Sequence, residues 1–393
     1  DYSSAASDVY KRQTGNRNIF IGEWSGNRYT TACYNVAIGD GAAAHMTTSR
    51  HNVLLGYRSG YCLCASDNYN VYLGACAGFN STNGANVAIG MWAMNNMGMG
   101  ATNTAVGCNA LRGSTNVACN SGSGNISFGT QAAWNLTCGM CNIVMGYYSA
   151  TCLSCGDTNF FAGNYAATRV TTADHNIAIG CRAGANTTDS TGSGNIFLGE
   201  TAGCCVGTAC ENIGIGKGAL RTSGSNSAKN NIGIGVCAGR AISTGEYNVF
   251  VGQCSGSFTT TGCSNVAVGE CSLCKNQEGI YNVALGMRAL RMSCCHYNVA
   301  IGAEAGRCVD TGCFNVFLGT YAGVCITTNS ITSGSCNILI GCRAGLALSQ
   351  TGDRQLAIGL GCNSWIAGDS SYNVTVKCIT AVSYTHLRAH ETS

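Results

Sequence analysis

The sequence has no proline and few charged residues. Its 393 residues include 21 Lys and Arg against 18 Asp and Glu, so that only 10% are charged and the formal net charge is +3. Because proline cannot donate a backbone hydrogen bond, its absence is compatible with long β-ladders in which every N–H is used. The low charge argues against the basic stripe of an electrostatic nucleic-acid binder, and we expect no nucleic-acid partner.

Long hydrophobic segments are also missing. No run of 18 apolar residues occurs, so we expect no membrane insertion by this segment. Disorder is nevertheless excluded, because 46% of the residues are hydrophobic and the apolar positions recur periodically. We find no Ser–His–Asp set and no phosphate-binding loop. The sequence therefore predicts no enzyme, no cofactor, and no catalytic, cofactor-binding or metal-ligating residues.

A five-residue phrase, Asn followed by three apolar residues and Gly, dominates the sequence. Eleven of the 20 intervals between its starts are 17 residues long. A twentieth copy starts at Gln355, and a decayed one at Asn373 lacks the Gly. A short fixed period indicates one small structural unit that is stacked many times. The intact copies start at Asn18, Asn35, Asn52, Asn70, Asn86, Asn103, Asn125, Asn142, Asn159, Asn176, Asn195, Asn212, Asn231, Asn248, Asn265, Asn282, Asn298, Asn315 and Asn337.

The composition of the unit predicts its structure. β-Branched residues dominate the first and third apolar positions, as in Val266 and Val268, which favours a strand, and the following Gly allows a turn. The middle position is apolar too, which predicts a strand buried on both faces. A small residue three places after the Gly suggests a second short strand, and we expect the Asn side chains to form a hydrogen-bonded ladder. The fold class is therefore all-β: a parallel β-solenoid of about 20 coils of about 17 residues, roughly 100 Å long.

The doubly apolar strand also predicts self-association. A two-strand coil hides only one face of each strand within its own chain, and a second apolar stripe in water is rarely tolerated by monomers. We assigned the aromatic middle residues to that second face and expect them to form the core of a homotrimer. These candidates are Phe20, Tyr72, Phe161, Phe197, Phe250 and Phe317.

The 28 cysteines are the least usual part of the composition. Cys237, Cys254 and Cys271 share one repeat position, and so do Cys138 and Cys155, with spacings of 17 residues. Neighbouring coils lie about 4.8 Å apart, within the distance that a disulfide can bridge. Such columns indicate structural disulfides and an extracellular compartment.

A second cysteine pattern predicts bridges within one loop. Cys205 and Cys210, like Cys308 and Cys313, are five residues apart. Two other readings remain open: cysteines that pack as small apolar thiols, and metal sites, for which the Cys-x-x-Cys pairs are irregular and the histidines scattered.

The two ends of the chain lack the repeat. Ser3 to Gln13 and Val382 to Thr392 resemble translated adapters from sequencing libraries. We therefore expect three segments: an adapter-derived scar at 1–13, a β-solenoid domain at 14–381 and a second scar at 382–393. On this reading the chain is an assembled, metagenomic fragment of a longer protein.

The phrases NVAIG (from Asn35) and NVAIGAEAG (from Asn298) carry a family resemblance. They resemble the head repeats of trimeric autotransporter adhesins and the repeats of phage tail-fibre-like proteins. The resemblance covers about residues 16 to 368 and implies a left-handed parallel β-roll in which three chains pack around one axis. It also implies adhesion, with a host-cell receptor or glycan as partner, at an extracellular location on a cell surface or virion. The alternatives are a purely structural filament or sheath protein, and a carbohydrate-active solenoid enzyme.

Overall fold

The computed structural model describes residues 15–377 except 64–66, 99, 117–118, 187–189, 223–226, 325–331, 346–350 and 362. Every regular element within these residues is a β-strand, as the repeat predicts. The chain divides into two compact units, Asp1–Asn265 and Val266–Ser393. The predicted adapter segments 1–13 and 382–393 lie outside the described residues.

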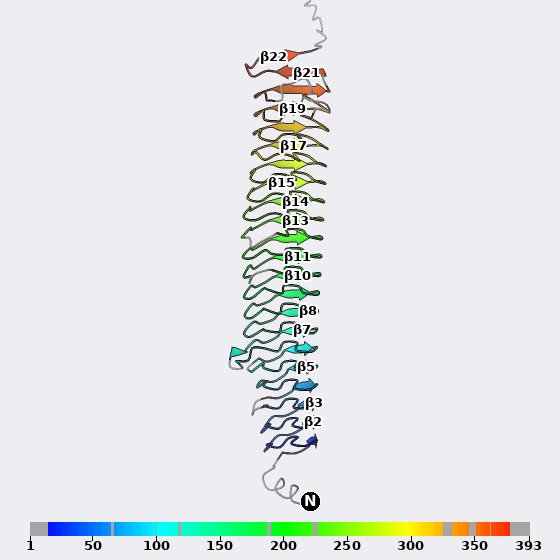
Figure 1. The fold of residues 1–393 in the computed structure, drawn as a ribbon, viewed down its shortest axis with the longest axis vertical. Coiled ribbons are helices and arrows are strands. Elements are labelled where there is room, and N and C mark those ends of the chain that lie inside the picture. Colours follow the sequence, from blue (N-terminus) through cyan, green and yellow to red (C-terminus); the bar gives the residue numbers. More distant parts are fainter. Residues whose placement is uncertain are drawn as a thin grey trace, which may run out of the picture. The chain divides into compact units, whose positions relative to one another are not determined.

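The first unit is a stack of coils that each contribute one three-residue strand, drawn from blue to green in Figure 1. Each strand pairs in parallel with the next one along the chain, and equivalent residues of successive repeats are partners, such as Ile126 with Ile143. This arrangement confirms the predicted parallel β-solenoid. The strands are β1 (Ile19–Ile21), β2 (Val36–Ile38), β3 (Val53–Leu55), β4 (Val71–Leu73), β5 (Val87–Ile89), β6 (Thr104–Val106), β7 (Ile126–Phe128), β8 (Ile143–Met145), β9 (Phe160–Ala162), β10 (Ile177–Ile179), β11 (Ile196–Leu198), β12 (Ile213–Ile215), β13 (Ile232–Ile234) and β14 (Val249–Val251).

The second unit continues the same pattern and then changes it. Strands β15 (Val266–Val268), β16 (Val283–Leu285), β17 (Val299–Ile301), β18 (Val316–Leu318), β19 (Ile338–Ile340) and β20 (Leu356–Leu360) form a parallel ladder. The copy at Gln355 thus supplies the last parallel strand. Two strands then pair antiparallel, β21 (Asn363–Gly368) with β20 and β22 (Val374–Val376) with β21. The decayed copy at Asn373 therefore forms a strand, but outside the parallel ladder.

Each strand from β2 to β19 buries its middle residue and leaves the two flanking residues partly exposed. Leu54 in β3 is fully buried, whereas its neighbour Val53 is 36% exposed. The coil lies on one side of the strand only, and side chains alternate between the two sides. The single chain therefore buries one face of each strand, as expected for a coil that covers one side only. Burial of the other face by partner chains stays a prediction.

Two positions of the repeat fill the interior: the middle residue of the strand and the residue six places after it. Where the middle residue is large, as at Phe250, the residue six places later is Gly256, and a Cβ on that glycine would lie 2.3 Å from the ring. Where the middle residue is small, as at Ala105, the later position holds a buried Leu111. In such coils the two positions share one volume of the close-packed core. Where both are glycine, as at Gly233 and Gly239, Leu220 and Phe250 of the adjacent coils fill the space.

The segment after the repeat glycine forms turns instead of the predicted second strand. It still bonds from coil to coil: the N–H of Gly41 donates to Glu23 O at 2.8 Å on one side, and that of Ala43 donates to Ser59 O at 3.0 Å on the other. Ala43 has a φ of 54°, in the left-handed region. The N–H of Ala42, between Gly41 and Ala43, donates to Gly39 O of its own coil at 3.1 Å, so this segment forms a ladder that is not a β-sheet.

The asparagine column forms the predicted ladder. Both the backbone N–H and the Nδ2 amide of Asn52 donate to Oδ1 of Asn35, each at 3.0 Å. The amide of Asn52 also donates to Asp67 O at 2.9 Å. Both asparagines are buried, so each amide ties one strand start to the next coil and to its return loop.

Candidate functional site

An aliphatic face runs along the outside of the strands in each unit. We define it as the first and third residues of β1–β14 in the first unit and of β15–β19 in the second. Apart from Thr104 its members are apolar, mostly Val, Ile and Leu, and Ile38, Ile143 and Ile234 are each 38% exposed. Contiguous apolar surface of this kind is uncommon on soluble monomers and marks an interaction surface.

The residues predicted for a trimer core do not lie on this face. Tyr72, Phe161, Phe250 and Phe317 are fully buried and Phe197 is 3% exposed, inside the coils of a single chain. Phe20, in the first described coil, is half-buried and its ring lies against Gly26. That assignment was wrong, because the middle residue of each strand points inward and the β-branched neighbours point outward.

The cysteines form two disulfides among the described residues, Cys138–Cys155 and Cys295–Cys313. The first joins two adjacent coils through the column that the spacing of 17 residues indicated. The second also joins successive coils, and therefore Cys313 does not pair with Cys308 as predicted.

The other predicted bridges are not formed. Cys205 and Cys210 are both thiols, and the Sγ of Cys205 lies 3.3 Å from that of its neighbour Cys204. Cys237 and Cys271 are thiols too, so no disulfide joins either of them to Cys254. At Cys313 a bridge between coils thus takes the place of the predicted bridge within a loop.

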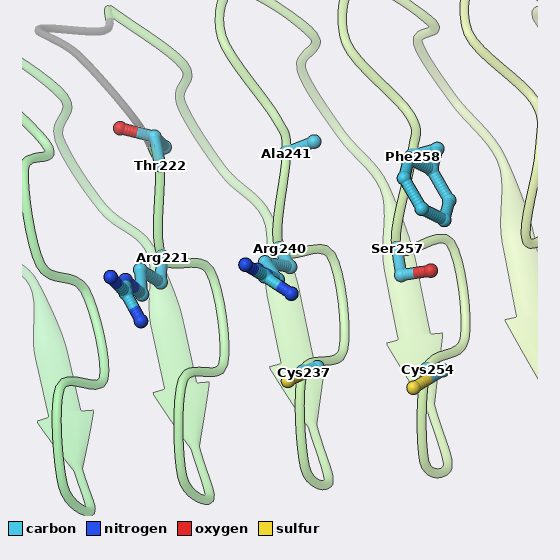
Figure 2. A pocket seen from close by; sticks show the side chains of 8 residues that line it. All are labelled: Arg221, Thr222, Cys237, Arg240, Ala241, Cys254, Ser257 and Phe258. Atoms are coloured by element: carbon cyan, nitrogen blue, oxygen red, sulfur yellow. The ribbon is translucent and has the colours of Figure 1, made fainter.

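An open groove lies beside the strands of the first unit, and Figure 2 shows its lining. Its volume is about 360 Å³. The lining comes from three successive coils, those that begin with β12, β13 and β14, and consists of Arg221, Thr222, Cys237, Arg240, Ala241, Cys254, Ser257 and Phe258. We call it the arginine groove.

The two arginines occupy the same repeat position on adjacent coils. Both side chains are exposed, and in Figure 2 both guanidinium groups extend in the same direction. Ala241 stands between the larger Thr222 and Phe258, and its small side chain leaves the space open. Neither arginine takes part in an ion pair with any residue that the structure describes.

In the second unit, two arginines form ion pairs with one buried carboxylate. Glu304 is 3% exposed and accepts from Arg288 at 3.2 Å and from Arg307 at 2.7 Å. One carboxylate therefore pairs with both of these guanidinium groups, whereas no described residue forms an ion pair with Arg221 or Arg240. A buried carboxylate with two cationic partners is a structural ion pair.

Positive charge extends from the groove toward the preceding coils. Burial raises the pKa of the Cys204 thiol to about 12, and the hydrogen bond from Cys205 acts in the same direction. The positive charges of Arg221 and Arg182 act on this pKa in the opposite direction. Arg182, Arg221 and Arg240 thus belong to the coils of β10, β12 and β13.

Sequence reasoning missed the arginine groove and also two aromatic ladders. Tyr34, His51 and Tyr69 stack with centroid distances of 4.9 and 5.0 Å, and Tyr281, Tyr297 and Phe314 with 5.1 and 4.8 Å. All six rings directly precede a repeat asparagine, so the repeat register was the signal that could have found them. Within each stack the ring faces cover one another, which contributes about 0.5–1.5 kcal/mol per pair.

Within residues 15–377, apart from the gaps given above, no group of three His, Cys, Asp or Glu is placed to hold a metal ion. The same part of the chain contains no helix that is long and apolar enough to span a membrane. Comparison with protein-family models, curated proteins and solved structures gives no match to this chain.

Proposed function

We propose that this chain is a structural and adhesive segment of an extracellular fibre, and that it works as a homotrimer assembled through the aliphatic face. On this proposal the fibre belongs to a cell surface or a virion, and it mediates attachment to a receptor or glycan of a host cell.

The aliphatic face is the observation that carries the proposal. Every strand from β1 to β14 presents outward side chains at the same spacing, one coil after another. A partner must repeat at that spacing to cover the face evenly, and a parallel copy of the same chain does so. Burial of one such side chain contributes roughly 1.5–3 kcal/mol when it is complete, so many equivalent contacts add up to a stable assembly.

The disulfides support the extracellular part of the proposal. Cys138–Cys155 and Cys295–Cys313 each tie one coil to another. Such bonds persist in oxidising compartments and are rare in reducing ones. A rigid stack of coils, with its backbone groups bonded between neighbours, suits an element that holds an attachment site at a distance.

The double variant Ile179→Asp/Ile234→Asp tests the proposal. Both residues are on the aliphatic face, 37% and 38% exposed, so the single chain tolerates the carboxylates in water. An assembled trimer would bury them unpaired, which is unfavourable. Light scattering should give one-chain particles for the variant, with circular dichroism unchanged. The matched control Asn164→Asp, on an exposed turn away from this face, should keep the mass of the parent protein.

Three outcomes contradict the proposal. The double variant could keep the mass of the parent protein, or the parent could itself be a stable monomer. Particles that grow without limit as concentration rises would instead favour the alternative of a structural filament or sheath.

A further inference from the structure

We propose that the arginine groove binds an acidic polysaccharide, with Arg221 and Arg240 holding a carboxylate or sulfate group of the sugar chain. No residue of this groove belongs to the aliphatic face, so the site remains open in a fibre assembled through that face. The choice of a polymeric ligand over a free anion rests on the proposed attachment function.

The two guanidinium groups are the first part of the argument. They belong to adjacent coils, whose backbones are about 4.8 Å apart, and have no acidic partner among the described residues. Like charges at this spacing repel each other, and an anion between them removes the repulsion. Guanidinium groups bind carboxylate and sulfate-like oxyanions with paired hydrogen bonds, a geometry that a lysine lacks.

The neighbouring coil adds the features expected for a sugar ring. Phe258 is 55% exposed and stands beside Ser257 at the edge of the groove. The negative face of an aromatic ring attracts the weakly positive C–H groups of a sugar. The groove volume of about 360 Å³ falls within the range of roughly 300–1,000 Å³ that is usual for ligand sites.

A third exposed arginine belongs to the same run of coils. Arg182 lies in the coil of β10, two coils before Arg221 and at a different repeat position. Three cations spread over four coils match a chain that carries acidic groups at intervals better than they match one small anion. A nucleic acid would require a longer basic stripe, and the net charge of the whole chain is only +3.

Binding of a fluorescent heparin oligosaccharide to the full chain tests the proposal, with fluorescence anisotropy as the readout. Heparin should bind, and binding should weaken as ionic strength rises. The double variant R221Q/R240Q should weaken it by roughly tenfold or more, because hydrogen bonds to charged groups are lost. The control R58Q/R343Q removes two exposed arginines that pack over Tyr57 and Tyr321 outside the groove, and it should leave the affinity unchanged.

Several results would overturn the proposal. Equal losses of heparin affinity in R221Q/R240Q and R58Q/R343Q would mean that the overall charge of the protein attracts heparin and that the groove does not bind it specifically. If neutral dextran, inorganic sulfate alone or a single-stranded oligothymidylate bound as tightly as heparin, an acidic polysaccharide would not be the ligand of the groove. Light scattering on the same samples separates the two proposals. Monomeric chains that still bind heparin contradict only the trimer, and trimers that do not bind heparin contradict only the ligand of the groove.

Discussion

The Nδ2 amide of Asn159 donates to Oδ1 of Asn142 at 2.9 Å, and the backbone N–H of Asn159 donates to the same oxygen at 3.0 Å. The amide of Asn142 in turn donates to Oδ1 of Asn125 at 3.0 Å and to Gly156 O at 2.7 Å. One buried side chain therefore connects three successive coils. An amide side chain provides one acceptor oxygen and two N–H donors. Asparagine carries this group on a short side chain, and glutamine carries it on a longer one.

Replacement of Asn142 by Ala should destabilise the protein by at least about 2 kcal/mol, because buried donors and acceptors on both neighbouring coils lose their partner. Thermal unfolding followed by circular dichroism measures the effect. The control Asn164→Ala, on an exposed turn, should leave the melting temperature nearly unchanged. Similar melting temperatures for the two variants would show that the ladder does not stabilise the stack.

The volume exchange inside the coils predicts a compensating pair of substitutions. Phe250→Ala should destabilise the protein by about 3–5 kcal/mol, because it opens a cavity in the core. Adding Gly256→Leu should recover part of the loss, since the pair then copies Ala105 and Leu111. The backbone allows the change: φ is 56° at Gly256 and 48° at Leu111. A double variant that melts below Phe250→Ala would contradict this account of the core.

The repeat glycine should tolerate no side chain. Gly163 has a φ of 139°, and a Cβ on it would lie 2.4 Å from Gly180 O. Because the obstacle is the backbone of the next coil, Gly163→Ala should lower the melting temperature strongly.

Gly124→Ala is the control for this substitution. Gly124 has a φ of 69°, and its nearest neighbour would be Cys141 Sγ at 3.5 Å. Residues such as Cys141 and Thr158 adopt a similar φ at the same repeat position, so the effect should be about 1 kcal/mol or less. If both substitutions lowered the melting temperature equally, the close approach of the next coil would not be the reason that Gly163 excludes a side chain.

The disulfide between adjacent coils should contribute to stability. Cys138→Ser opens a loop closed over a sequence separation of 17 residues, which should cost about 3 kcal/mol. Cys141→Ser changes an exposed thiol and should have little effect. Mass spectrometry of non-reduced peptides should find Cys138 linked to Cys155 and Cys295 to Cys313. Recovery of Cys308 linked to Cys313 would contradict the structure.

The sequence predicted the features that depend on the repeat period. The strands, their parallel register and the asparagine ladder all follow from residues that recur every 17 positions, such as Asn142 and Asn159. The direction of the middle residue was missed, because three consecutive apolar residues do not show which side faces inward. The alternation of Phe250 with Gly256 and of Ala105 with Leu111 was the available signal, since only interior positions compensate in volume.

The candidate site was less predictable than the fold. Arg221 and Arg240 each lie five residues after their repeat glycine, and this register places them side by side. Whether a described acidic residue pairs with them depends on side chains of other coils, which the sequence of one repeat does not reveal. The prediction of the cysteine pairs failed for a related reason. Cys308 is near Cys313 in the sequence and Cys295 lies on the preceding coil, and residue spacing alone does not show which of the two forms the disulfide.

Sedimentation equilibrium of the full chain at micromolar concentration tests the central claim most directly. One chain has a mass of 40.4 kDa, and a homotrimer assembled through the aliphatic face predicts a single species of three times that mass. A single species of 40.4 kDa that remains soluble would show that the aliphatic face stays exposed in water and would contradict the account.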